Sequence, residues 1–401
     1  MRRAARAEQI EPFYVMEIAK QAAAVARASA GSRERMIYLN VGEPDFTAPP
    51  LVREAAEKAI RDGATGYTPS AGLDSLRERI SGWYAERFHL NVPASRIVVT
   101  SGASAALHLA CLALVNPGDE ILMPDPTYPC NRQFVHLAGG RAVLIPAHAA
   151  ARYQLSAAQV EQHWSEHTRG VLLASPSNPT GTSIQPDELC RIAATVAAHD
   201  GITLIDEIYL GLSYDPAYGQ SALALSDQIV SINSFSKYFN MTGWRLGWLV
   251  LPEELVSTVE KIAQHLYICP STIAQHAALA CFAPESLAEY ERRRAEFKAR
   301  RDWFVPQLNA LGLTVPVLPD GAFYAWANCQ SACERLFGGK GAAQAAGSWE
   351  LASELIQRAH VAITPGRDFG QAETAQYVRF STANSMTRLE AAVERLTWLL
   401  G

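Results

Sequence analysis

Short apolar runs alternate with helical segments through the middle of this chain, and this alternation is what most constrains its fold. Two of these runs, 170–174 and Ile202–Asp206, are apolar over almost their whole length and have the length of strands. Strands buried on both faces have this composition, and strands that alternate with helices need crossover connections. The sequence therefore predicts an α/β fold with a mainly parallel sheet and helices on both faces. The expected strands are 97–100, 120–123, 143–146, 170–174, 202–206, 228–233 and 246–251, with helices over 104–115 and 186–199 among them.

The pattern changes near residue 284. A long charged helix is predicted over 284–311, followed by strands at 323–327 and 377–381 and helices at 348–359 and 387–400. This second part predicts a smaller α+β domain. We expect an N-terminal arm (1–45) that contributes to the small domain and covers the site, a large ligand-binding domain (46–284) and a small C-terminal domain (285–401). The Gly- and Ala-rich segment 338–347 is predicted to be a flexible loop.

Composition excludes several classes of partner. The net charge is −5 with 19% charged residues, so no basic excess points to nucleic acid. Residues 10–30 are interrupted by charges and a proline, which is unlike a signal peptide, and the sequence has no apolar run long enough for a membrane span. Seven cysteines without a CxxC pair argue against a disulfide framework and favour the cytoplasm. No metal is expected.

A possible phosphate site follows the first expected strand, at Thr-Ser-Gly-Ala-Ser-Ala-Ala-Leu, residues 100–107. There Gly102, Ala103 and Ser104 would direct backbone N–H groups and the positive end of a helix toward one point, which suits a phosphate. The alternative is an ordinary strand-to-helix turn, and alone this motif favours the turn.

A lysine lies in the aromatic, glycine-containing segment 234–248, which follows another apolar strand. Burial lowers the pKa of an amine and makes Lys237 a usable nucleophile toward a carbonyl group. Ser234, Ser236 and Arg245 could complete a phosphate site, with two charge-assisted bonds from the guanidinium. The alternative is a lysine that extends to solvent from a helix start, and the local sequence does not separate the two.

Two further strand ends carry polar side chains. In Leu-Ile-Asp-Glu-Ile-Tyr, the buried strand ends at Asp206, and Tyr209 follows three residues later. In Ser-Pro-Ser-Asn-Pro-Thr-Gly, two prolines fix a loop that contains Asn178. Taken singly, a helix cap explains the first motif and turn chemistry explains the second. Ligands collect at the carboxyl ends of strands in such sheets, so the four motifs together indicate one site.

Together these motifs resemble fold-type-I pyridoxal-phosphate enzymes, specifically the class I and II aminotransferases related to aspartate aminotransferase. The resemblance extends from Asn-Val-Gly-Glu-Pro-Asp-Phe at residue 40 to Arg-Phe-Ser at residue 379, with the motifs in the family's order. It implies that Lys237 carries pyridoxal 5′-phosphate as a Schiff base and acts as the general base. It implies that Asp206 pairs with the pyridine nitrogen and keeps the ring an electron sink.

The resemblance also assigns the surrounding residues. Tyr209 and Asn178 bond the phenolic oxygen of the cofactor, with a cis Asn178–Pro179 bond, and Tyr128 stacks on the ring. The phosphate is held by the 102–104 turn, Ser234, Ser236 and Arg245. Tyr67 reaches the phosphate of the neighbouring subunit, which implies a homodimer with a shared active site. Gly42 and Arg379, together with Asn178, bind the substrate carboxylate.

Two positions depart from the family pattern. The phosphate turn has Ala103 where relatives are more polar, so that bond must come from its backbone. Arg367 is charged where many relatives have a small residue; it faces either the substrate side chain or solvent, and the sequence slightly favours solvent.

The resemblance implies transamination between an L-amino acid and a 2-oxo acid, with the donor left open. A β-eliminating C–S lyase of the same fold is the main alternative, because it would share Lys237, Asp206 and Arg379. A transcription regulator on this fold needs a DNA-binding module before the body, and the motif at residue 40 leaves no room for one. The intact Lys237, Asp206 and Arg379 set argues against a non-catalytic relative.

Overall fold

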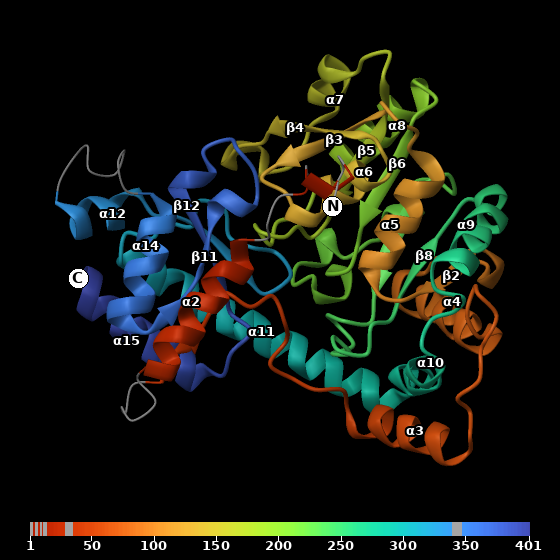
Figure 1. The fold of residues 1–401 in the computed structure, drawn as a ribbon, viewed down its shortest axis with the longest axis horizontal. Coiled ribbons are helices and arrows are strands. Elements are labelled where there is room, and N and C mark those ends of the chain that lie inside the picture. Colours follow the sequence, from red (N-terminus) through yellow and green to blue (C-terminus); the bar gives the residue numbers. More distant parts are fainter. Residues whose placement is uncertain (1–2, 5–6, 9, 11–13, 29–34, 339–346) are drawn as a thin grey trace.

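A seven-stranded sheet forms the centre of the larger lobe, on the right of Figure 1. The computed structural model describes residues 3–4, 7–8, 10, 14–28, 35–338 and 347–401. The strand order is β2-β8-β7-β6-β5-β3-β4, and β8 pairs antiparallel with its neighbours while the other pairs are parallel. The strands are β2 (Ile97–Thr100), β3 (Glu120–Asp125), β4 (Arg141–Pro146), β5 (Thr168–Ala174), β6 (Ile202–Asp206), β7 (Val230–Ser234) and β8 (Gly247–Val250).

Six of the seven strands run in one direction, because β8 is antiparallel to both β2 and β7. Their carboxyl ends therefore meet at one edge of the sheet. Thr100, Asp125, Ala174, Asp206 and Ser234 are the last residues of five of these strands. The four motifs that the sequence analysis singled out all follow strand ends at this edge.

Helices cover both faces of the sheet, which confirms the predicted α/β architecture. Leu172 and Leu204 pack on one face in a cluster with side chains of α5 and α9. Val171, Leu173 and Ile205 alternate with them and pack on the other face against α7 and α8. The helices of this lobe are α3 (Pro50–Arg61), α4 (Asp74–Phe88), α5 (Ala103–Leu114), α6 (Pro129–Leu137), α7 (Ala157–His163), α8 (Pro186–Ala198), α9 (Glu253–Leu266) and α10 (Thr272–Leu279).

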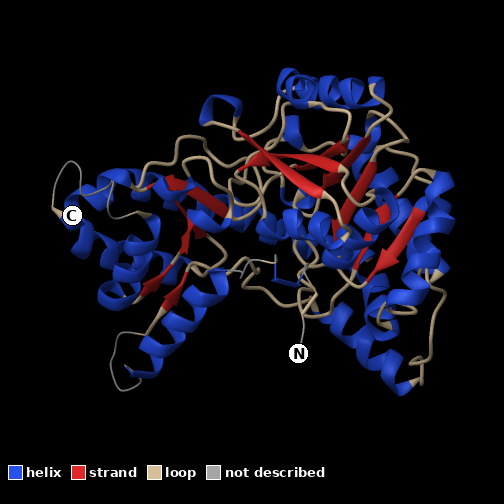
Figure 2. Ribbon diagram, turned by 45° about the horizontal axis from the view of Figure 1, so that its top comes forward, coloured by secondary structure: helices blue, strands red, loops and turns tan. Residues whose placement is uncertain are grey.

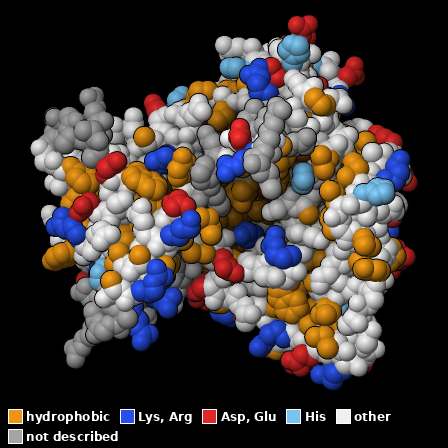
Figure 3. Space-filling view, viewed as in Figure 1, with side chains coloured by type: hydrophobic (Ala, Val, Ile, Leu, Met, Phe, Trp, Pro, Cys, Tyr) orange, Lys and Arg blue, Asp and Glu red, His pale blue; other side chains and the backbone are white. Residues whose placement is uncertain are grey.

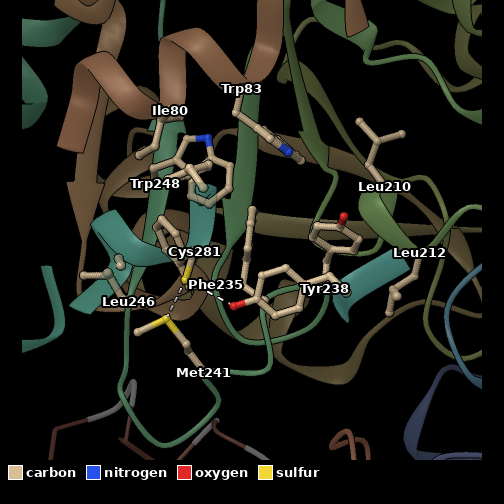
Figure 4. Close-up of a cluster of buried hydrophobic side chains, with 14 of the residues drawn as sticks. Ile80, Trp83, Leu210, Leu212, Phe235, Tyr238, Met241, Leu246, Trp248 and Cys281 are labelled. Carbon is tan, nitrogen blue, oxygen red and sulfur yellow. Dashed lines mark hydrogen bonds between the residues drawn. The ribbon is translucent and has the colours of Figure 1, made fainter. Parts of the chain in front are cut away.

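The segment after β7 is fixed by an aromatic cluster on which its own side chains pack (Figure 4). Phe235, Tyr238 and Met241 are each at most 3% exposed. Phe235 lies 5.0 Å from Trp248 between ring centroids, and Trp248 meets Trp83 at 5.9 Å. Large aromatic side chains dominate core energetics. The backbone is therefore anchored on both sides of the intervening lysine, which fixes where that side chain begins.

The smaller lobe, on the left of Figures 1 and 2, has a three-stranded antiparallel sheet in the order β11-β12-β9 and a short parallel pair, β1 and β10. The helix predicted over 348–359 is α14 followed by a π-helical turn, Leu355–Ala359. The domain boundaries remain a prediction, and residues 339–346 of the expected loop lie outside the described residues. The remaining elements are α2 (Tyr14–Ala28), β1 (Ile37–Tyr38), α11 (Pro284–Ala310), β9 (Tyr324–Asn328), α12 (Gln330–Phe337), α14 (Ser348–Glu354), β10 (Val361–Ala362), β11 (Thr364–Pro365), β12 (Tyr377–Ser381) and α15 (Met386–Leu400).

Helix α2 lies near the N-terminus but packs against the smaller lobe. Its fully buried Ile18 and Ala22 belong to the same apolar cluster as Phe304 of α11 and Phe380 of β12. None of the helices within the described part of the chain is long and apolar enough to cross a membrane.

Candidate active site

A cavity of about 470 Å³ lies where the carboxyl edge of the large sheet meets the smaller lobe and α2. Figure 3 shows a hollow between the two lobes with apolar side chains around it. The structure brings most of the predicted site residues together in its lining: Gly42, Ala103, Ser104, Tyr128, Asn178, Asp206, Tyr209, Ser234, Ser236, Lys237, Arg245 and Arg379.

Asp206 ends strand β6 and is 4% exposed. Its Oδ1 accepts a hydrogen bond from the Ile208 N–H at 3.1 Å. Burial raises the pKa of this carboxyl group to about 7, although the Ile208 N–H and the positive charge of Lys237 oppose the shift. A buried carboxylate with so little compensation is suited to bind a cationic partner within the cavity.

Lys237 extends into the cavity from the loop after β7. Its Nζ donates a hydrogen bond to the Gly42 carbonyl oxygen at 2.6 Å and lies 5.8 Å from the Tyr209 ring centroid. Burial lowers the pKa of this amine to about 8. Near neutral pH, a much larger fraction of this lysine is therefore neutral than of an exposed lysine, and the neutral form is the one that acts as a nucleophile or general base.

Arg379 enters the cavity from β12 and is 3% exposed. Its Nη1 donates to Asn178 Oδ1 and its Nη2 donates to the Asn40 carbonyl oxygen, both at 2.8 Å. The guanidinium carbon also lies 4.4 Å from the Tyr324 ring centroid, and the buried Nε has no hydrogen-bond partner in the structure. A buried guanidinium with unused N–H donors is suited to a carboxylate.

One end of the cavity has the composition of an anion site. Helix α5 begins there at Ala103, and the first N–H groups of a helix have no partner within the helix. Ser234 and Ser236 lie nearby, with the Ser236 N–H bonded to Ser234 Oγ at 3.0 Å. Arg245 completes this end. Gly102 does not line the cavity, but it has φ +86° and a Cβ there would lie 2.5 Å from the Arg245 guanidinium.

Tyr209 and Gly42 both lie against the side chain of Tyr324, which the sequence motifs did not indicate. Tyr209 Oη shares a hydrogen bond of 2.7 Å with Tyr324 Oη. A Cβ at residue 42 would lie 2.5 Å from Tyr324 Oη, so the close approach of the residue 42 backbone to this ring requires glycine. Tyr324 was missed because it belongs to a strand of the smaller lobe, far away in the sequence. A single tyrosine at the start of a strand gives no local sequence signal of a functional site.

Besides Gly102, two candidates lie apart from the cavity lining. Tyr67 is 82% exposed, so in the single chain its ring faces outward. Arg367 is also exposed, and its guanidinium carbon lies 4.0 Å from the Tyr14 ring centroid and 4.9 Å from that of Trp349. The solvent-facing alternative for Arg367, slightly favoured by the sequence, agrees with this position. The Asn178–Pro179 bond is cis, as predicted.

Other residues that line the cavity were not predicted from the sequence, because only the fold brings them to the cavity. The most notable are the apolar side chains of α2 in the lining, Val15, Met16 and Ala19. The described residues contain no cluster of three or more His, Cys, Asp or Glu side chains placed to hold a metal ion.

Comparisons with known proteins identify the family. The sequence profile of aminotransferase class I and II matches residues 34–396. A valine–pyruvate aminotransferase from Mycobacterium tuberculosis is 36% identical over 97% of each chain. The crystal structure of an aminotransferase from Mycobacterium tuberculosis has a TM-score of 0.90 at 35% identity, covering 100% of this chain and 99% of that one. The aspartate aminotransferase of Rhizobium meliloti has a TM-score of 0.91 at 30% identity, with the same coverage. This chain therefore belongs to the class I and II aminotransferases, a fold-type-I family of pyridoxal-phosphate-dependent enzymes that act on amino and oxo acids.

Proposed function

We propose that this aminotransferase moves the amino group of an L-amino acid to pyruvate or 2-oxoglutarate in two successive half-reactions. One observation carries the proposal: Lys237, Asp206 and Arg379 line a single cavity although they lie far apart in the sequence. The name of the Mycobacterium tuberculosis relative, a valine–pyruvate aminotransferase, supports pyruvate as one acceptor.

The side chains in the cavity fit pyridoxal phosphate. The start of α5, Ser234, Ser236 and Arg245 would hold the phosphate, and the buried carboxylate of Asp206 would meet the pyridine nitrogen. The pKa of Asp206, raised to about 7 by burial, supports this pairing, since a cationic ring would compensate the buried charge. When bound, the cofactor supplies an aldehyde and an electron-accepting ring.

The remaining residues would tune the cofactor ring and orient the substrate. Tyr128 would contact the ring face, while Tyr209 and Asn178 would bond its phenolic oxygen. Asn178 also accepts a hydrogen bond from Arg379, so the cofactor and carboxylate sites share one side chain. Lys237 would accept the proton from the substrate Cα, and Arg379 would fix the orientation of that Cα–H bond.

The exposed Tyr67 supports a homodimer in which this ring reaches the phosphate in the partner's site. The ring is 82% exposed in the single chain, so it is accessible to the surface of a partner subunit. Both the dimer and the cytoplasmic location remain predictions.

A panel of amino donors tests the proposed reaction. Purified protein with pyridoxal phosphate is expected to produce a new oxo acid and the amino acid of the acceptor in equal amounts, with pyruvate or 2-oxoglutarate as acceptor. Donor alone should give at most one oxo acid per site, because the amino group stays on the enzyme until an acceptor removes it. Continuous release of pyruvate and ammonia from cystathionine without acceptor would instead identify the C–S lyase.

The pKa of Lys237 predicts how cofactor capture depends on pH. Only the neutral amine attacks the aldehyde, so the capture rate of the apoprotein should rise about tenfold per pH unit at low pH and level off above about pH 8. Nα-acetyl-lysine amide in solution keeps a free side-chain amine with a pKa of about 10.4, so its rate should still rise with pH above about pH 8. Stopped-flow absorbance measures both. If the capture rate of the apoprotein keeps rising above about pH 8 in parallel with that of the small-molecule lysine, the pKa of Lys237 is not lowered.

A further inference from the structure

One wall of the cavity is apolar and comes from the first turns of α2. Val15, Met16 and Ala19 line it, as does Val41. Val41 lies between two residues whose carbonyl oxygens bond the reactive groups: Asn40 accepts from Arg379, and Gly42 accepts from Lys237. A substrate whose carboxylate is bound by Arg379 would therefore lie in a cavity with an apolar wall.

Two of these side chains are unusually exposed for a cavity wall. Met16 is 55% exposed and Val41 is 42% exposed. Large apolar side chains grouped at the wall of a cavity indicate a surface that a ligand covers. An apolar substrate side chain would remove this surface from water, whereas a charged side chain would lose hydration there.

The basic side chains of the cavity are already engaged. Among the described lining residues they are Lys237, Arg245 and Arg379. Lys237 is needed at the reacting carbon, Arg379 binds the α-carboxylate, and Arg245 lies at the anion end beside Gly102. A second carboxylate on the substrate would find no basic partner on this wall, and an unpaired charge there is costly.

Helix α2 is held in place over the cavity by the smaller lobe. The Asp368 carboxylate accepts hydrogen bonds from the Tyr14 N–H at 3.0 Å and the Val15 N–H at 2.6 Å. A carboxylate at a helix N-terminus also interacts favourably with the helix dipole. Arg367 adds its contact with the Tyr14 ring. These contacts fix the first turn of α2, and with it the position of the apolar wall.

We propose that the cavity selects amino acids with an uncharged aliphatic side chain, and that Val15, Met16 and Ala19 determine this specificity. The proposal rests on the aminotransferase reaction proposed above and names its substrate class. Leucine and valine fit the wall, whereas aspartate and glutamate would place a second carboxylate against it.

Steady-state kinetics with pyruvate as acceptor test the specificity. For the wild type, kcat/KM for leucine or valine should exceed that for aspartate and glutamate at least about 100-fold. Met16→Lys adds a cation to the wall and should raise the glutamate-to-leucine ratio of kcat/KM at least about tenfold. Ala24→Lys adds the same charge to an exposed position of α2 outside the cavity lining and should leave that ratio unchanged.

A wild-type preference for aspartate or glutamate would overturn the proposal, and so would an equal change of the ratio in both variants. Failure of every donor would refute the proposed reaction. In that case, calorimetric binding of two unreactive acids to the holoenzyme still decides the specificity. 4-Methylpentanoate should bind at least about tenfold more tightly than succinate, and the reverse order would refute the apolar wall.

Discussion

Replacing Lys237 with alanine is expected to abolish the covalent retention of pyridoxal phosphate and to lower kcat by about 10²–10⁴-fold or more. The loss has two causes: the amine that bonds the cofactor is gone, and so is the base within reach of the substrate Cα. Borohydride reduction followed by intact-protein mass spectrometry measures the first effect, and steady-state kinetics measures the second.

Lys261→Ala is the matched control, because Lys261 is an exposed lysine of α9 outside the cavity. It should retain one reduced cofactor per chain and full activity. Covalent retention of the cofactor by the Lys237→Ala protein would contradict the assignment. Binding of cofactor without a covalent bond would not, since the phosphate site remains.

Replacing Arg379 with alanine is expected to lower kcat/KM for amino acids and oxo acids alike by about 2–5 kcal/mol of transition-state binding. Each 1.4 kcal/mol is tenfold, so the loss is about 30-fold to several thousand-fold. The guanidinium is buried and its geometry matches a carboxylate in two hydrogen bonds. Removing it leaves the substrate carboxylate without a charged partner.

Two controls separate this role from a structural one. Arg388→Ala removes an exposed arginine of α15 and should leave kcat/KM unchanged. An amine donor without a carboxylate should react equally slowly with the wild type and with Arg379→Ala. Since Arg379 also bonds Asn178 and Asn40, urea unfolding should show whether the variant is folded. Unchanged kcat/KM for amino acids in a folded variant would rule out the carboxylate role.

The strands of the fold were predictable because their sequence signals are local. Ile97–Thr100, Ile202–Asp206 and Tyr377–Ser381 begin and end where the apolar runs predict. The predicted strand 228–233 lies at Val230–Ser234 instead, because pairing with β6 and β8 sets its ends. Helices α2, α3 and α4 were not predicted. In α2 the apolar face contains small alanines, which are weak signals until the smaller lobe packs on them.

The site was predictable where chemistry and strand ends coincide. Lys237 and Asp206 were selected from strand-end motifs and Arg379 from the family resemblance, and the fold places all three in one cavity. Tyr324 and the wall of α2 could not be selected, because they reach the cavity through tertiary packing alone. Tyr67 lines no part of the cavity within a single chain, so its role depends on an assembly that a single sequence does not specify.

A crystal structure of the protein with its cofactor tests the assignment of Lys237 and Asp206 most directly. We expect continuous density between Lys237 Nζ and the aldehyde carbon of pyridoxal phosphate, with the Asp206 carboxylate within hydrogen-bond distance of the pyridine nitrogen. A cofactor bonded to another residue, or a ring nitrogen with no carboxylate beside it, would show that Lys237 and Asp206 do not have these roles.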